Sequence, residues 1–479
     1  MWLTIFANAL SLFSEPLDVS SLLQAYLENN IALQKLANQK DAALLSEKIS
    51  KLDNGLSLQL STGNVTVRTN GKTAGAQFSP NASLAIPQAN DLRFFFNTNV
   101  SLTNEKKTAT NSELGAEAEL IPQTKRKVSL LQKERETNEA ERALLNGMLS
   151  AESNFYETLK SLYNRKIAIA QAQKKLYEDK ISLEELRARG YSETSSKYRS
   201  LTLDVASDEQ TIETNKRAFS SELAIFLKQC GLAENLENTN ASEVSNKNEL
   251  ANFLPNEIPF VDAVSANDFP KERFAEIEDA SWKKYFNSLS RSSEKNISVK
   301  ANASYTFANS ETDSDSLNTG AKLSWSGLSA GVGVSLPTAN KTENSSPVYS
   351  FSLAVNPFEF MKKKLTRKQK KLLEAQDELS LLDAEQKYDE KIIEMENNRS
   401  NMLWQKEMNA KNFSLYSALE SDNKKFLDAG MISESEYRAS LANKIVYQYK
   451  MLINNIDIIL YNNQTKMLFS PIKEIEIKK

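Results

Sequence analysis

The chemistry open to this chain is narrow, because two versatile side chains are almost absent. The 479 residues contain no histidine and a single cysteine, Cys230. The lack of imidazole excludes Ser-His-Asp catalysis, Cys-His catalysis and most zinc sites. One thiol forms neither an intrachain disulfide nor a thiolate metal cluster. We therefore expect no metal site and no cofactor.

The remaining composition also argues against an enzyme and against a nucleic-acid partner. Ser–Lys chemistry is the enzymatic alternative, but the sequence has no glycine-rich nucleophile elbow and no phosphate-binding loop. The 59 basic and 62 acidic residues give a net charge of −3, whereas a nucleic-acid binder needs a basic excess or stripe. The mean hydropathy is −0.48, and no run of about 18 apolar residues predicts an ordinary transmembrane helix.

The N-terminal segment, residues 1–16, has features of a secretory signal. It is apolar, ends in small residues and contains Ala7-Asn8-Ala9, which resembles an A-x-A cleavage site. It lacks a basic n-region, and its apolar stretch is short. We interpret it as the end of a signal peptide with a misplaced start. A packed or disordered tail is the alternative.

Proline and glycine positions predict two pairs of long helices. No proline occurs in residues 123–254 or 358–470, and both stretches are rich in strong helix formers. Each stretch divides at a glycine, Gly190 or Gly430, followed by serine and glutamate, as where one helix ends and another begins. We predict a helix of roughly 65 residues, a tight turn and a helix of roughly 37, twice over. Helices about 100 Å long require coiled-coil-like packing.

Two other segments, 56–121 and 297–356, alternate with the period of a β-strand. In the clearest run, Asn296 to Phe307, apolar residues point one way and polar residues the other, over a length typical of a bilayer-crossing strand. Further strand candidates are 93–102, 113–120 and 349–356, with shorter ones at 56–60, 65–69, 84–86, 323–325 and 330–336. The alternative is a soluble β-sandwich in which each sheet has one solvent-exposed face.

The whole pattern is an internal repeat with an offset of about 240 residues. Each half runs helix, strands, long helix, turn, shorter helix, and the opening helices are expected at about 19–51 and 271–291. The first repeat covers 17–233 (strands 56–121, hairpin 123–230) and the second 269–470 (strands 297–356, hairpin 358–469), with a linker at 234–268 and a C-terminal tail at 471–479. A basic cluster follows the strands in each half, at Lys125–Lys127 and Lys362–Lys364. Contact with lipid headgroups and a solvated charge run are both open for these clusters.

This duplicated pattern resembles the TolC-like family of outer-membrane efflux proteins, from about Leu17 to Phe469. Residues 22–35, with LLQAYLENN and then LQK, look like the family's opening helix, and FLDAGMIS at 426–433 looks like its "aGliS" tip. The order, spacing and duplication carry the resemblance more than any single motif. The family has two principal strands in each half, whereas this sequence has up to four or five candidates. Its first tip, at 191–194, is a looser match, and Ala439 stands where the family has a second acid.

The resemblance implies a mixed α and membrane β fold, in which a trimeric β-barrel is continued by a periplasmic α-helical barrel. It implies the exit duct of a tripartite efflux or type I secretion system, passively exporting small molecules or polypeptide across the outer membrane of a diderm bacterium. Its expected partners are two further copies of itself, a periplasmic adaptor (membrane fusion) protein, an inner-membrane transporter and outer-membrane lipid. The alternative is a structural or adhesive envelope protein that uses its long hairpins as a periplasmic spacer.

The resemblance and the residue patterns together assign roles at the helical tips. The expected adaptor-docking residues are Gly190, Tyr191, Ser192, Gly430, Met431, Ile432 and Ser433. Packing within the trimer is the alternative for Met431 and Ile432. Three tip carboxylates are candidates for a charged ring at a tunnel constriction: Asp428, Glu434 and Glu436. Ordinary helix N-terminal charges are the alternative reading of these acids.

Strand parity assigns the two faces of the barrel wall. The residues expected to face a water-filled lumen are Ser298, Lys300, Asn302, Ser304, Thr306, Glu117 and Glu119. Those expected to face lipid are Phe94, Phe96, Tyr305, Phe307, Tyr349 and Phe351. The alternative for the residues expected to face the lumen is that their side chains only solvate the barrel wall and do not select what passes through it.

Overall fold

A computed structural model describes residues 18–63, 65–69, 74–87, 89, 91–103, 107–120, 124–232, 254–293, 297–307, 315–325, 327–338 and 346–470. The expected signal segment, the C-terminal tail and most of the linker lie outside these residues. The chain divides into two compact units, each built from separate stretches of sequence. The first unit comprises Met1–Asn38, Arg142–Ala275 and Gln386–Lys479, and the second comprises Gln39–Glu141 and Glu276–Glu385.

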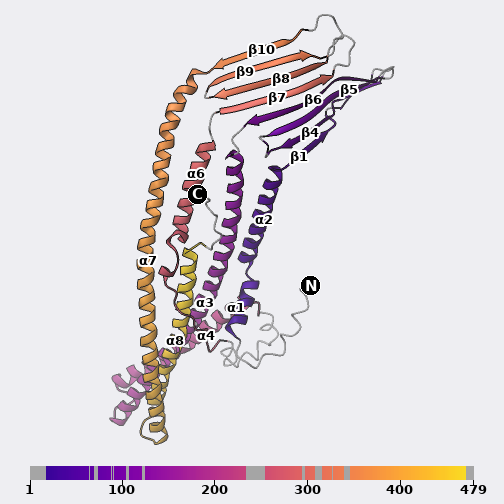
Figure 1. Cartoon of the computed structure of the whole chain (residues 1–479). Helices are drawn as coiled ribbons and strands as arrows, with labels where there is room; N and C mark the ends of the chain where they lie inside the picture. The colour runs from indigo at the N-terminus through magenta and orange to yellow at the C-terminus, as the bar shows by residue number, and fades with distance from the viewer. Residues whose placement is uncertain are drawn as a thin grey trace. The chain divides into compact units, whose positions relative to one another are not determined.

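The predicted pattern of a long helix, a turn and a shorter helix occurs in both halves. The α-helices labelled in Figure 1 are α1 (Val19–Glu28), α2 (Ile31–Asp53), α3 (Thr124–Ala188), α4 (Ser196–Gln229), α6 (Ala275–Ser293), α7 (Pro357–Asp428) and α8 (Glu434–Leu468). Helices α3 and α7 contain 65 and 72 residues, and their partners α4 and α8 contain 34 and 35. Two short 3-10 helices, Ala266–Asp268 and Lys271–Arg273, precede α6.

The opening helix is divided in two, where the sequence pattern predicted one helix over 19–51. Asn29 ends α1, and the side-chain oxygen of Asn30 accepts a hydrogen bond from the Ala32 amide at 2.9 Å. Asparagine competes for backbone hydrogen bonds and therefore favours helix ends over helix interiors. The Asn29-Asn30 pair accounts for the break.

The hydrophobic core of the first unit lies among α1, α3, α4 and α8. Phe155, Tyr163 and Ile456 are fully buried there, and the Tyr163 hydroxyl donates to the carbonyl of Pro255 at 2.7 Å. Helix α4 contributes an apolar stripe to this core, since Leu223, Phe226 and Leu227 are all at most 2% exposed. Apolar side chains at helical spacing thus hold the long helices together.

The second unit contains one ten-stranded antiparallel sheet. Its strands are β1 (Ser57–Ser61), β2 (Val65–Thr69), β3 (Ala74–Phe78), β4 (Asn81–Ile86), β5 (Leu92–Thr103), β6 (Lys107–Leu120), β7 (Ile297–Phe307), β8 (Ser316–Trp325), β9 (Leu328–Pro337) and β10 (Val348–Val355). The main path runs β1-β4-β5-β6-β7-β8-β9-β10, while β2 pairs with β3 and β3 with β5. The β6–β7 pair joins the two halves of the repeat.

The sheet is open, with β1 and β10 at its opposite edges (Figure 1). The described residues form six strands in the first half and four in the second, more than the two principal strands per half of the TolC-like family. Strand β3, with the sequence AGAQF, was not predicted, and β8 begins seven residues before the predicted 323–325. Both segments are rich in small residues with weak β propensity, so only their pairing in the sheet marks them as strands.

Candidate functional site

The sheet separates its side chains into one apolar and one polar face. Residues directly paired across antiparallel strands share a face. One row of paired residues crosses the sheet from β5 to β10: Phe94, Ala116, Ala303, Thr319, Val334 and Tyr349. The six residues predicted to face lipid therefore all lie on the apolar face: Phe94, Phe96, Tyr305, Phe307, Tyr349 and Phe351. Phe351 is 78% exposed, so large apolar side chains on this face are not covered by the rest of the chain.

The opposite face carries the polar residues that the sequence pattern grouped together. These are Ser298, Lys300, Asn302, Ser304, Thr306, Glu117 and Glu119. Ser304 lies on this face but is only 6% exposed. The reason is that the Phe95 ring reaches across Gly115 toward the Ser304 side chain. A bulky replacement at Ser304 is therefore not a neutral change, in contrast to the expectation for a solvated position.

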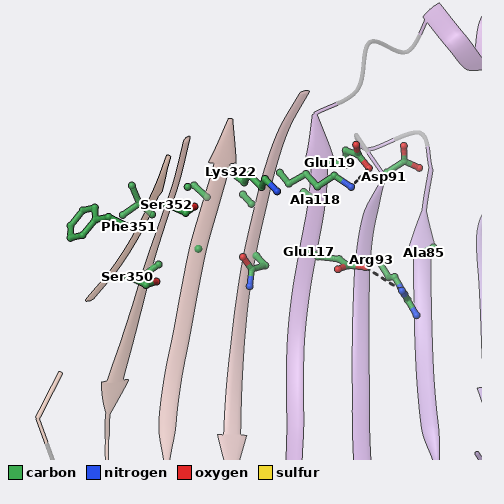
Figure 2. A pocket seen from close by; sticks show the side chains of 18 residues that line it. Ala85, Asp91, Arg93, Glu117, Ala118, Glu119, Lys322, Ser350, Phe351 and Ser352 are labelled. Atoms are coloured by element: carbon green, nitrogen blue, oxygen red, sulfur yellow. Dashed lines mark hydrogen bonds and ion pairs between the residues drawn. The ribbon is translucent and has the colours of Figure 1, made fainter. Parts of the chain in front are cut away.

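Two cross-strand ion pairs lie on the polar face. Arg93 Nη1 is 3.2 Å from Glu117 Oε1, and the two side chains face each other on neighbouring strands in Figure 2. Lys300 Nζ is 3.0 Å from Glu119 Oε2. Both pairs are partly exposed, so each contributes at most about 1 kcal/mol. Their effect is mainly to balance charge on this face.

The same residues surround an open hollow of about 670 Å³ (Figure 2). Gly320, Gly331 and Gly333 line it on the side of β8 and β9, where the lack of side chains keeps it open. Lys322 also lines the hollow and forms no ion pair with any residue that the structure describes. Sequence reasoning missed Lys322, although its polar parity with Ser324 was a usable signal.

The turn between α7 and α8 has the glycine geometry that the sequence predicted. Gly430 has φ of +69°, and the Met431 amide donates back to the carbonyl of Phe426 at 2.8 Å. This is the hydrogen bond of a Schellman end. Ser433 then caps α8, accepting from the Glu436 amide while Glu436 accepts from the Ser433 amide. Met431, between these two caps, is 71% exposed.

The turn between α3 and α4 ends in the same way but restarts later. Gly190 has φ of +77°, and the Tyr191 amide donates to Leu186 at 3.1 Å. The cap of α4 is Ser195, whereas the sequence pattern pointed to Ser192. Ser192 instead bonds to Thr194 within the loop. The first tip is therefore two residues longer than the second, which agrees with its looser match to the family pattern.

The three candidate constriction acids at the second tip differ in their local bonding. Glu436 belongs to the capping box, and Glu434 forms an ion pair with Arg438 at 2.6 Å. Asp428 is exposed, with no hydrogen bond or ion pair to any described residue. Glu434 and Glu436 both lie in the first turn of α8, where the helix N-terminal alternative places them, and Asp428 is the carboxylate left for a role outside the hairpin.

A buried carboxylate that sequence reasoning missed fixes the second hairpin just before its tip. Glu420 of α7 is 9% exposed and accepts from Lys444 Nζ at 3.0 Å and from the Tyr437 hydroxyl at 2.9 Å. These bonds, the one from Lys444 first, lower the pKa of Glu420. A lowered folded-state pKa means that the stabilisation is present at neutral pH and is lost as the pH falls through that pKa.

Gly430→Val should destabilise the tip without changing the sheet. An added Cβ meets nothing within 4 Å, so the effect comes from the positive φ alone, about 1–2 kcal/mol. We expect faster protease cleavage near residue 430 and unchanged unfolding of the sheet, which belongs to the other compact unit. Ala429→Val, one residue earlier and at a position without a positive φ, is the matched control. Equal cleavage of both variants would contradict the positive-φ explanation.

Other sources of reactivity are limited within the described residues. No group of three or more His, Cys, Asp or Glu side chains there is placed to hold a metal ion. Cys230 is buried, and burial raises the pKa of its thiol to about 12. A thiol with such a pKa stays protonated and is a poor nucleophile. Among the described helices, none is long and apolar enough to cross a membrane.

Two family profiles match this chain in succession. Residues 22–258 match the TP096X N-terminal domain, and residues 259–471 match the TP096X C-terminal domain. Together they cover residues 22–471 without a gap, and the chain therefore belongs to the TP096X family. The boundary between the two domains falls within the predicted linker.

Several solved structures are similar to this chain along most of its length. The outer-membrane channel OprN has 13% sequence identity and a TM-score of 0.49, with 94% of this chain and 90% of that chain covered. CusC, described through its folding and transmembrane channel formation, has 11% identity and a TM-score of 0.45, with coverage of 94% and 92%. The Campylobacter jejuni outer-membrane channel CmeC has 12% identity and a TM-score of 0.44, with coverage of 93% and 85%. No curated protein sequence matches the chain.

Proposed function

We propose that this protein is a passive exit duct in the outer membrane, serving a tripartite efflux or type I secretion system. The observation that carries the proposal is the separation of the sheet into two faces. Large apolar residues such as Phe351 are exposed on one face, and the ion pairs of Arg93 and Lys300 lie on the other. A wall with lipid on one side and water on the other has this pattern.

The open edges of the sheet support closure by further copies of the chain. The main path has eight strands, each antiparallel to the next, so β1 and β10 run in opposite directions. The β10 edge of one copy can therefore pair antiparallel with the β1 edge of another. An unpaired edge exposes backbone hydrogen-bonding groups, which closure into a barrel would satisfy. We propose three copies, because the TolC-like family that the sequence resembles is trimeric.

The helices next to the two edges also present unpartnered apolar side chains. On α7, Phe358, Leu365, Leu372 and Leu379 recur every seven residues and are each 65–79% exposed. On the C-terminal half of α2, exposed apolar side chains include Leu45, Ile49 and Leu52. A seven-residue apolar repeat is the pattern of a coiled-coil seam. We assign the α7 seam to contact with the α2 side of a neighbouring copy.

The remaining partners follow from the duct hypothesis. The helical hairpins would lie in the periplasm and end in the two glycine tips, at Gly190 and Gly430. An adaptor protein would dock there, and an inner-membrane transporter would supply the energy. The duct itself would bind no cofactor and catalyse no reaction while small molecules or polypeptide pass through.

Single-channel recording together with mass measurement tests the proposal. We expect stepwise ion currents when the full chain is added to planar lipid bilayers. We also expect a mass in mild detergent three times that of the 53.7 kDa chain. A trimer that never conducts would favour the spacer alternative, in which the hairpins only bridge the periplasm. A non-conducting monomer would overturn the duct and its assembly together.

Met431→Ser with Ile432→Ser should abolish export while leaving the trimer intact. Met431 is 71% exposed in a turn, and an exposed apolar side chain at this place suits contact with another protein. We expect loss of cross-linking to the adaptor and normal trimer abundance. Tyr191→Ser at the first tip is the matched comparison. Normal export in the double variant would remove the docking role of the second tip, and a lost trimer would assign these side chains to packing between copies.

A further inference from the structure

Basic residues gather near the start of both long helices, where the chain leaves the sheet. Seven of the ten residues from 362 to 371, close to the start of α7, are lysine or arginine. Helix α3 begins Thr-Lys-Arg-Lys, with no acidic residue in its first turn. The N-terminal end of a helix dipole repels cations. This repulsion weakens the start of α3, whereas the first turn of α7 holds Glu359 and its basic residues begin at the second turn. For α7 it is the density of like charge within ten residues that indicates a role outside the helix itself.

Most cations of the α7 cluster have no anionic partner. Lys362 is within 3.6 Å of Glu359, and Lys370 donates to the carbonyl of Arg291 at 2.9 Å. Four exposed members form no ion pair with any residue that the structure describes: Lys364, Arg367, Lys368 and Lys371. We call residues 362–371 the basic collar. Its unpaired charge fits an anionic surface outside the protein.

The basic collar begins where the apolar face of the sheet ends. Trp325, the last residue of β8, lies on that face opposite Ile297 and is 46% exposed. Lys363 Nζ lies 5.0 Å from the centre of the Trp325 ring. The turn after Trp325 also contacts the approach to α7, since the Asn356 amide donates to the Gly327 carbonyl at 2.7 Å. The exposed apolar face of the sheet is therefore followed by Trp325 at its rim, and Trp325 is followed by the cations of the basic collar.

The order of these side chains, apolar, then tryptophan, then cationic, matches the layers of a lipid leaflet. Acyl chains contact apolar side chains, indole rings favour the interface, and ammonium or guanidinium groups bind headgroup phosphates. We propose that the basic collar binds the headgroups of anionic phospholipids in the periplasm-facing leaflet. The inference rests on the proposed function, because that function places the sheet in a membrane. It adds a lipid class and the residues that select it.

Quenching of Trp325 fluorescence by brominated lipids tests the inference directly. The full chain, with Trp2, Trp282 and Trp404 replaced by phenylalanine, is reconstituted into vesicles containing brominated phosphatidylglycerol or brominated phosphatidylcholine. We expect phosphatidylglycerol to be preferred at Trp325. The preference should fall about fivefold for each collar cation removed. It should also weaken as salt is added, because ionic strength screens exposed charges.

Three matched variants separate the collar from charge in general. Lys364→Gln, Lys368→Gln and Lys371→Gln together should remove the preference, and the corresponding arginine substitutions should retain it. Lys411→Gln, Lys424→Gln and Lys425→Gln remove the same charge further along α7 and should change nothing. If the collar variant fails to assemble, the salt titration of the unsubstituted collar decides the matter.

The outcomes for the collar and for the duct are distinguishable. Equal quenching by both lipids, a preference that salt does not change, or a preference retained by the glutamine variant would overturn the collar. Stepwise currents from the same sample would then leave the duct standing. Absence of quenching by either lipid would overturn both, because the sheet would not lie in the bilayer.

Discussion

Ala301→Lys should destabilise the assembled barrel by about 2–4 kcal/mol, whereas Asn302→Lys should have almost no effect. The two residues are neighbours at the middle of β7, and both are exposed. Ala301 lies between Ala118 and Ala321 on the apolar face, and Asn302 lies between Glu117 and Gly320 on the polar face. The difference arises because a cation on the lipid side must leave water, while the same cation beside Glu117 stays hydrated.

Unfolding of the reconstituted protein by heat or denaturant measures this difference. The two variants are well matched, because each introduces a lysine into the same strand and the two positions are adjacent. They therefore differ in the face of the sheet and hardly at all in depth within the membrane. Alanine has little side chain to lose, so lost packing adds little to the result. Equal destabilisation by both variants would contradict a membrane location for the sheet and favour the soluble sandwich that the strand pattern alone leaves open.

Strand parity was readable from the sequence, because alternation depends only on neighbouring residues. All the aromatic residues expected on one face, from Phe94 to Phe351, do lie together in the sheet. The environment of a single position was not readable in this way. Ser304 shares the polar parity but is covered through Phe95, which lies two strands away. Its burial depends on cross-strand pairing that no local pattern contains.

The helical tips show the same limit at shorter range. The positive φ of Gly190 and Gly430 was predictable, since each glycine follows a long helical pattern. The cap of α4 was not, because Ser192 and Ser195 both precede suitable helix starts and only the backbone geometry selects Ser195. The network around Glu420 was also missed. It joins residues 17 and 24 positions apart, which become neighbours only after the chain turns at Gly430.

Leu372→Glu with Leu379→Glu should convert the trimer into monomers. The two leucines are 72% and 65% exposed in the single chain, so the substitutions remove little from the folding of the chain itself. In the proposed seam each leucine would be buried, and burial of a leucine is worth about 1.5–3 kcal/mol. Losing two per contact weakens each contact between copies by about 3–6 kcal/mol, or a hundredfold to more than a thousandfold. Burying the new carboxylates would add to this loss.

Mass in mild detergent, with circular dichroism of the same sample, tests the seam. We expect a folded species at 53.7 kDa in place of one at three times that mass. Thr366→Glu with Ser380→Glu is the control, because each position directly follows a seam leucine (365 or 379) and points to another side of the helix. A trimer that survives in the leucine variant would exclude the α7 seam. Monomers in both variants would attribute the effect to added negative charge. Only dissociation confined to the leucine variant identifies the seven-residue repeat of α7 as the contact between copies.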